Sequence, residues 1–175
     1  MPIYLESDLR LLYGAYDYLW DHDLAAQSTT SRLLHERDLT FLAGRVADEL
    51  AELRGTVAGT HGHGGGRDDM VLEAYQSLYW LIVFAVAAGD RYDDLQPHEA
   101  LALSTLSGVA HDYWHGDEWA WLDDPRQRRA AIRQGIALLA EECRRGGVDV
   151  AEAVARDLRE LRSKPYLEPY WSTHD

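Results

Sequence analysis

Apolar residues recur along this chain mostly at intervals of three and four, the spacing that places them on one face of an α-helix. Few segments show the two-residue alternation of a half-buried strand. The clearest apolar stripe lies between the capping residues QSTTS and the glycines at 55–59, and it comprises Leu39, Leu42, Val46, Leu50, Leu53 and Val57. This stripe predicts one helix that begins near residues 31–36 and ends near residues 55–59.

The same periodicity, with capping and breaking residues, predicts five further helices. Asp68 or Asp69 is expected to cap the helix that follows the glycines, and Pro165 is expected to stop the last one. The segment HGDEWAWLDDP is predicted to be irregular, and the tail YLEPYWSTHD to be extended. The five helices are expected at about 7–21, 68–89, 97–113, 125–145 and 150–163. Together these helices predict a single all-α domain over residues 1–175, a bundle of about five to six helices.

Residues 68–89, DDMVLEAYQSLYWLIVFAVAAG, become apolar nearly all round, as expected of the central helix of a bundle. The longest strictly apolar run, residues 78–88, is much shorter than the about 20 residues of a membrane helix, so no membrane span is predicted. The beginning, MPIYLESDLR, lacks the basic and then apolar order of a signal peptide, and Cys143 is the only cysteine. We therefore expect a cytoplasmic protein.

Composition and charge argue against some classes of protein and of function. With 46% hydrophobic residues, the chain has the composition of a folded protein rather than a disordered one. Its net charge of −13 argues against binding to a nucleic-acid polymer, which requires clustered cations. A small phosphorylated ligand remains compatible with this charge if a divalent metal or a few arginines neutralise it.

Acidic side chains lie where two of the predicted helices are expected to face each other. Glu49 and Glu52 lie on the flank of the apolar stripe, within the sequence DELAE. One face of the next helix carries Asp69, Glu73, Gln76 and Trp80. If the two helices pack antiparallel across the linker GTHGHGGGR, both sets meet in one cleft.

Carboxylates that converge in this way repel one another unless a cation neutralises them. Mg²⁺ or Mn²⁺ accepts such oxygen ligands and usually keeps waters and substrate phosphates in its shell. A spare carboxylate can then deprotonate a water that attacks a phosphoanhydride. Acidic pairs at this spacing are also common on solvated helix faces, so the pair in DELAE alone does not decide between the two interpretations.

The order DELAE, 20 residues, then EAYQ resembles the MazG-like all-α nucleoside triphosphate pyrophosphohydrolases. Their relatives include the phosphoribosyl-ATP pyrophosphohydrolases and the dimeric dUTPases, and their pattern is EExxE, a spacer, ExxD and an apolar helix. The resemblance covers about residues 39–88. It implies a MazG-like core at about residues 31–113, with additional C-terminal helices at about 125–163.

The resemblance also implies a site and a reaction. Glu49, Glu52 and Glu73 would bind Mg²⁺ or Mn²⁺, and Asp48 would act with Glu49 and Glu52 as a supporting acid. The reaction would convert an NTP or dNTP to the monophosphate and pyrophosphate. Members of this family build their sites at subunit contacts, so a homodimer or homotetramer is expected.

Gln76 departs from the family pattern, which has an aspartate at this position. Gln76 could bind the metal through its carbonyl oxygen, or Asp69, one turn earlier, could supply the missing carboxylate. A third possibility is that catalysis is impaired or lost. The alternative function is therefore a non-catalytic helical module that binds a nucleotide or a protein partner.

Four residues are candidates for nucleotide contacts. Arg67 and the glycine-rich linker could cradle a phosphate, although such a linker could equally be a plain flexible loop. Trp80 lies one turn beyond Gln76. Arg162 and Lys164, at the end of the last predicted helix, could reach phosphates or complement the helix dipole.

Histidines offer two weaker alternatives. His61 and His63 in the linker could bind a metal, but two histidines without a third ligand carry little weight. A second alternative function is an HD-type metal phosphohydrolase that would use His111 and Asp112, and this loose pattern also includes His35 and Asp149. His111 could instead simply favour a helix C-terminus.

Overall fold

The computed structural model describes residues 3–62, 64, 66–103, 112–116 and 118–174. Within this part of the chain every regular element is a helix and no residue lies in a strand, which confirms the predicted all-α class. Six helices have eight or more residues, and α5, η1 and α9 are single turns. The elements are α1 (Ile3–Asp21), α2 (Thr29–Glu36), α3 (Leu39–Ala58), α4 (Arg67–Ala87), α5 (Tyr92–Leu95), α6 (Pro97–Ala102), α7 (Pro125–Arg145), α8 (Val150–Arg162), η1 (Pro165–Leu167) and α9 (Glu168–Trp171).

The single helix predicted from about residue 31 to residue 58 is wrong, because the chain turns between α2 and α3. Arg37 adopts a left-handed backbone conformation (φ 52°) and ends α2. The carboxylate of Asp38 then accepts a hydrogen bond from the Phe41 N–H at 3.0 Å and caps α3. Asp38 therefore starts a new helix at a point where the continuous apolar stripe gives no indication of a break.

Three other boundaries also differ from prediction. Asp68 and Asp69 lie in the first turn of α4, and Gly66 precedes the helix without a side-chain cap. The helix expected at 97–113 ends at Ala102, because Leu103 is extended; residues 104–111 lie outside the described part. The tail is helical rather than extended.

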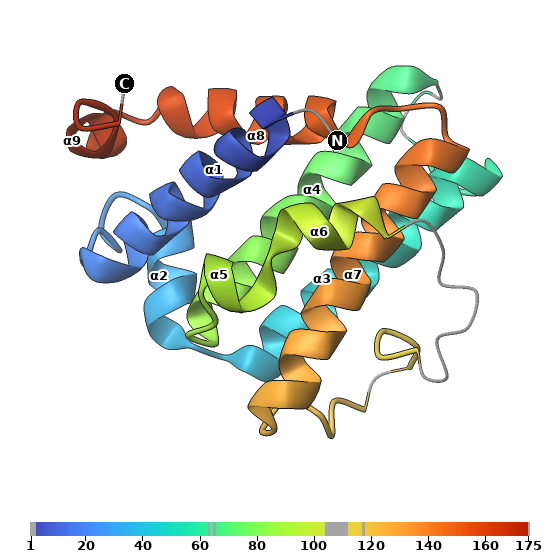
Figure 1. Ribbon diagram of the computed structural model, residues 1–175, viewed down its shortest axis with the longest axis horizontal. Coiled ribbons are helices and arrows are strands. Elements are labelled where there is room, and N and C mark those ends of the chain that lie inside the picture. The colour runs from blue at the N-terminus through green and yellow to red at the C-terminus, as the bar shows by residue number, and fades with distance from the viewer. Residues whose placement is uncertain (1–2, 63, 65, 104–111, 117, 175) are drawn as a thin grey trace.

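The central position of α4 agrees with its sequence pattern. It packs against α1, α2, α3, α7 and α8, and every residue from Leu81 to Ala87 is buried (Figure 1). By length and composition alone α4 could cross a membrane, but 67% of its most apolar 18-residue stretch is buried inside the bundle. This burial is what the core helix of a bundle would show.

The packing of α3 against α4 positions the acidic residues. The two helices are joined only by residues 59–66, which we call the linker, and they pack side by side over much of their length. Gly59 adopts a left-handed conformation (φ 76°) and ends α3, so the chain can reverse direction immediately. The two helices are antiparallel, as predicted, and this pairing brings Glu52 of α3 close to Glu73 of α4.

Candidate metal centre

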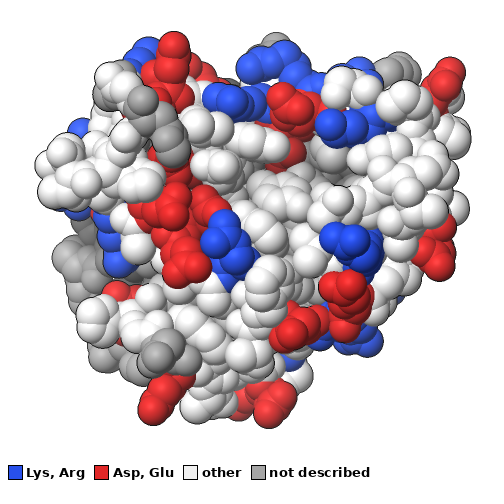
Figure 2. Space-filling model, turned by 180° about the vertical axis from the view of Figure 1, so that it is seen from behind, with Lys and Arg blue, Asp and Glu red and all other residues white. Residues whose placement is uncertain are grey.

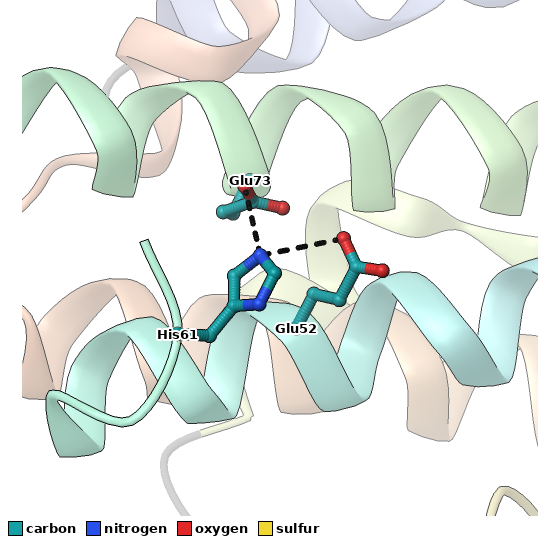
Figure 3. Close-up of side chains that lie close together, drawn as sticks. All are labelled: Glu52, His61 and Glu73. Carbon is teal, nitrogen blue, oxygen red and sulfur yellow. Dashed lines mark ion pairs between the residues drawn. The ribbon is translucent and has the colours of Figure 1, made fainter. Parts of the chain in front are cut away.

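Three side chains from three consecutive elements converge between α3 and α4. Glu52 comes from α3, His61 from the linker and Glu73 from α4, as Figure 3 shows. The Nε2 atom of His61 lies 3.6 Å from Oε2 of Glu52 and 3.6 Å from Oε1 of Glu73. One ligand atom from each residue lies within 4.8 Å of the other two. This spacing allows small side-chain rotations to bring all three onto one cation.

The linker holds His61 over the end of α3. The N–H groups of Thr60 and His61 both donate to the carbonyl of Gly55, at 2.8 and 3.1 Å. A Cβ atom on Gly55 would lie 2.8 Å from Cβ of His61, so the linker can pack this closely only against a glycine. In the sequence, His61 and His63 form a pair without a third ligand. In the structure, Glu52 of α3 and Glu73 of α4 lie beside His61. His63 lies outside the described residues.

Glu49 lies one turn before Glu52 on α3, and the charges of Glu52 and Glu73 act on it. Its side chain is only 2% exposed, and its Oε1 atom forms an ion pair with Arg45. Its Oε2 atom is buried and has no hydrogen-bond partner among the described residues. Burial raises the pKa of Glu49, the guanidinium of Arg45 opposes this, and the charges of Glu52 and Glu73 raise the pKa further. One oxygen of Glu49 is therefore able to accept a proton or a cation.

The surroundings of the cluster are largely buried. Glu73 is fully buried at 0% exposure, and the Nε2 atom of His61 lies 3.6 Å from its Oε1 atom. Ser77, one turn further along α4, is also fully buried, and its Oγ atom has no hydrogen-bond partner in the described chain. Two carboxylates and one imidazole, from Glu52, Glu73 and His61, form a donor set that fits a divalent metal ion.

The predicted supporting acid Asp48 and the predicted ligand Asp69 do not belong to the cluster. Asp48 is exposed and pairs with Arg45 at 3.5 Å. The Oδ2 atom of Asp69 accepts a hydrogen bond from the Gly64 N–H at 3.0 Å, so this side chain helps to hold the linker. Gln76 is half-buried on α4, three residues after Glu73.

Trp80 of α4 lies close to Arg45 and Phe41 of α3. The guanidinium of Arg45, which pairs with Glu49, lies 5.0 Å from the centre of the Trp80 ring. Phe41 meets Trp80 edge to face and is 47% exposed. Seen from behind, the surface carries a compact acidic group with a basic side chain against it, next to a mostly uncharged area (Figure 2).

The predicted phosphate-binding cations do not gather at the cluster. Arg67 forms an ion pair with Glu152 and donates to the Gly147 carbonyl at 3.1 Å, so it joins α4 to the start of α8. It also lines, with His61 and the linker glycines, an open pocket of roughly 860 Å³. Arg162 and Lys164 line another pocket, which shares no residue with the first.

The residues of the HD-type alternative have structural contacts where they are described. The Nδ1–H group of His35 donates to the Ser31 carbonyl (2.7 Å) and the ring stacks on Trp20, and Asp149 caps α8. Asp112 accepts a hydrogen bond from the Trp114 N–H, and His111 lies outside the described residues. Since His35 and Asp149 are engaged on separate elements, these contacts give the alternative no support.

No protein-family model matches the sequence, and no curated protein or solved structure matches it. The resemblance to the MazG-like pyrophosphohydrolases therefore stays a prediction that depends on the two acidic motifs.

Proposed function

We propose that this protein is a metal-dependent nucleotide pyrophosphohydrolase, which converts an NTP or dNTP to the monophosphate and pyrophosphate. The observation that carries the proposal is the convergence of Glu52, His61 and Glu73 beside the buried carboxylate of Glu49. Glu52, His61 and Glu73 would hold Mg²⁺ or Mn²⁺. When bound, the ion would neutralise substrate phosphates and lower the pKa of a water.

In this proposal Glu49 acts as the general base. Arg45 engages Oε1 and orients the carboxylate, which leaves Oε2 to accept a proton from the attacking water. The oxygen of that water forms a bond to the α-phosphorus, the α–β bridging bond breaks, and pyrophosphate leaves. The raised pKa of Glu49 brings its basicity closer to neutral pH, where a general base is most effective.

Trp80 offers an apolar surface for the base of the nucleotide, at the end opposite its phosphates. Trp80 follows Glu73 by seven residues, which is about 10 Å along a helix at 1.5 Å per residue. This separation is comparable to the length of a ribose with its phosphates. A base stacked near Trp80 and Phe41 would therefore leave its phosphates at the acidic cluster.

The decisive assay is incubation of the purified protein with a panel of NTPs and dNTPs and Mg²⁺ or Mn²⁺, followed by separation of the products. We expect the monophosphate and pyrophosphate in equal amounts. Stepwise release of inorganic phosphate would contradict the proposed bond cleavage. If no nucleotide is hydrolysed but one still stabilises the fold, the non-catalytic module is correct, and Gln76 in place of a carboxylate would be its cause.

His61 is expected to set the metal preference. An imidazole nitrogen binds transition metals better than it binds Mg²⁺, so the wild-type protein should bind Mn²⁺ more tightly than Mg²⁺. His61→Ala should lower the Mn²⁺ affinity by about tenfold or more and change the Mg²⁺ affinity less. Calorimetric titration of both ions measures this, with His115→Ala, an exposed histidine, as the matched control. Equal losses for both ions would remove His61 from the ligand set.

A further inference from the structure

Two contacts join α3 to α4 at positions that are seven residues apart on each helix. At one position the guanidinium of Arg45 lies 5.0 Å from the centre of the Trp80 ring. At the other position the ligand atoms of Glu52 and Glu73 lie within 4.8 Å of each other. Because the helices are antiparallel and rise 1.5 Å per residue, the two contacts lie about 10 Å apart along the pair.

The guanidinium of Arg45 extends from the Trp80 ring toward the cluster. One terminal nitrogen donates to Oε1 of Glu49, and the other donates to Asp48 at 3.5 Å. Glu49 follows Arg45 by four residues on α3 and precedes Glu52 by three. A nucleotide with its base at Trp80 and its phosphates at the metal would therefore pass its sugar and α-phosphate along the guanidinium.

Arg45 has donors for a phosphate while it holds Glu49. A guanidinium carries five N–H groups, and within the described chain the hydrogen bonds of Arg45 use one on each terminal nitrogen. The Arg45 side chain is 34% exposed, whereas that of Glu49 is 3% exposed, so a ligand can reach the guanidinium from solvent. The planar fork of an arginine matches the spacing of phosphate oxygens.

The acidic surroundings of Arg45 favour such a contact. Glu49 lies against the guanidinium, and the charges of Glu52 and Glu73 act on Glu49. A phosphate brought to this place is repelled by the carboxylates, and a cation beside it offsets this repulsion. Arg67, which the sequence offered as a phosphate ligand, is engaged at the start of α8 instead.

We propose that Arg45 binds the α-phosphate of a nucleoside 5′-phosphate and holds it beside Glu49. This inference rests on the proposed function, because it concerns the same site and the same general base. In the proposed reaction the water oxygen bonds to the α-phosphorus, Glu49 takes the water proton, and the bridging bond to the β-phosphate breaks as pyrophosphate leaves. The guanidinium, already fixed by Glu49, would stabilise the charge on the α-phosphate oxygens during this step.

The contact can be measured without turnover. The four ribonucleosides and the four deoxyribonucleosides are each compared with their 5′-monophosphate by calorimetric titration at saturating Mn²⁺. The ratio of the two Kd values isolates the phosphate, because base and sugar are the same in both ligands. We expect the wild type to prefer the monophosphate in at least one pair, and Arg45→Gln to reduce that preference by about tenfold.

Arg54→Gln is the matched control for Arg45→Gln. Arg54 is another arginine of α3, and it belongs neither to the cluster nor to the contact with Trp80. The variant should therefore keep the wild-type preference for the monophosphate.

A second pair of variants guards against a loss of folding. Arg45→Gln leaves the buried carboxylate of Glu49 without its ion pair, so the substitution is also made together with Glu49→Gln, in which the amide carries no charge. The double variant should show the tenfold loss relative to Glu49→Gln alone. The proposal is overturned if no monophosphate is preferred by the wild type, or if the preference survives in both variants that lack Arg45. If the preference depends on Arg45 but the wild type hydrolyses no NTP or dNTP, the phosphate contact is supported and the proposed reaction is rejected.

Discussion

Replacing Glu73 with glutamine should abolish the stabilisation of this protein by Mn²⁺. Glu73 is the only fully buried carboxylate of the cluster, and the amide that replaces it keeps the volume but loses the charge. Changes to groups that merely support metal ligands cost 10–100-fold in affinity, so loss of a charged ligand should cost about 100-fold or more. At a metal concentration of 100 times Kd the wild type gains about 2.7 kcal/mol, or roughly 5–10 °C in Tm, and the variant should gain almost nothing.

Asp68→Asn is the matched control for this substitution. Asp68 lies in the first turn of the same helix, but it is exposed and does not belong to the cluster. Thermal unfolding with and without Mn²⁺ should show the full metal-dependent shift in Asp68→Asn and none in Glu73→Gln. A full shift in Glu73→Gln would disprove the metal centre. If Glu73→Gln loses the Mn²⁺-dependent shift in Tm and the wild type hydrolyses no nucleotide, the metal centre is supported and the proposed reaction is rejected.

The helices that could be predicted well are those with strong local signals at both ends. α7 lies between Pro125 and the glycines that follow Arg145, and its predicted and observed bounds coincide. The break at Arg37 could not be predicted, because an arginine gives no sign that it will adopt a left-handed conformation. α9 was missed for another reason: a helix of four residues is stabilised by the burial of Tyr170 and Trp171 rather than by local propensity.

In the candidate site, too, some positions could be predicted from the sequence and others could not. Helical periodicity and the short linker were sufficient to predict that Glu52 and Glu73 face one cleft, because both depend on regular geometry. The position of His61 depends on an irregular, glycine-rich backbone, for which no periodic pattern exists. Arg162 and Lys164 line a pocket that no residue of the cluster lines, and no residue in α8 encodes the direction in which this helix crosses the bundle.

Replacing Asp157 with asparagine should remove much of the pH dependence of stability between pH 4 and pH 8. Asp157 is 1% exposed on α8, and the Tyr16 hydroxyl of α1 donates to both of its oxygens, at 2.8 and 3.0 Å. Burial raises the pKa of Asp157 from 3.8 to about 7; the hydrogen bond from Tyr16 lowers it, and the charge of Glu160 raises it. At 1.36 kcal/mol for each pH unit, this difference corresponds to about 4 kcal/mol.

The direction in which stability changes with pH follows from which state, folded or unfolded, loses the Asp157 proton first. Above about pH 4 the unfolded chain releases the proton while the folded protein retains it, so the stability of the wild type falls as the pH rises to about 7. Above pH 7 the folded protein holds a buried charge, and Asp157→Asn, which never carries one, should be more stable by up to about 4 kcal/mol. Near pH 4 the two proteins should differ by no more than the pH-independent cost of the amide. Chemical denaturation from pH 4 to pH 8 measures both values.

Two further variants decide whether Asp157 itself is responsible. Glu160→Gln removes an exposed acid from the same helix and should leave most of the slope of stability against pH intact. Tyr16→Phe removes the hydroxyl that donates to Asp157, so the pKa of that carboxyl should rise further and the loss of stability should be largest at high pH. A wild-type slope in Asp157→Asn would mean that other groups cause the pH dependence. The carboxylate of Asp157 would then be ionised inside the bundle, with the hydrogen bond from Tyr16 offsetting the cost of its burial.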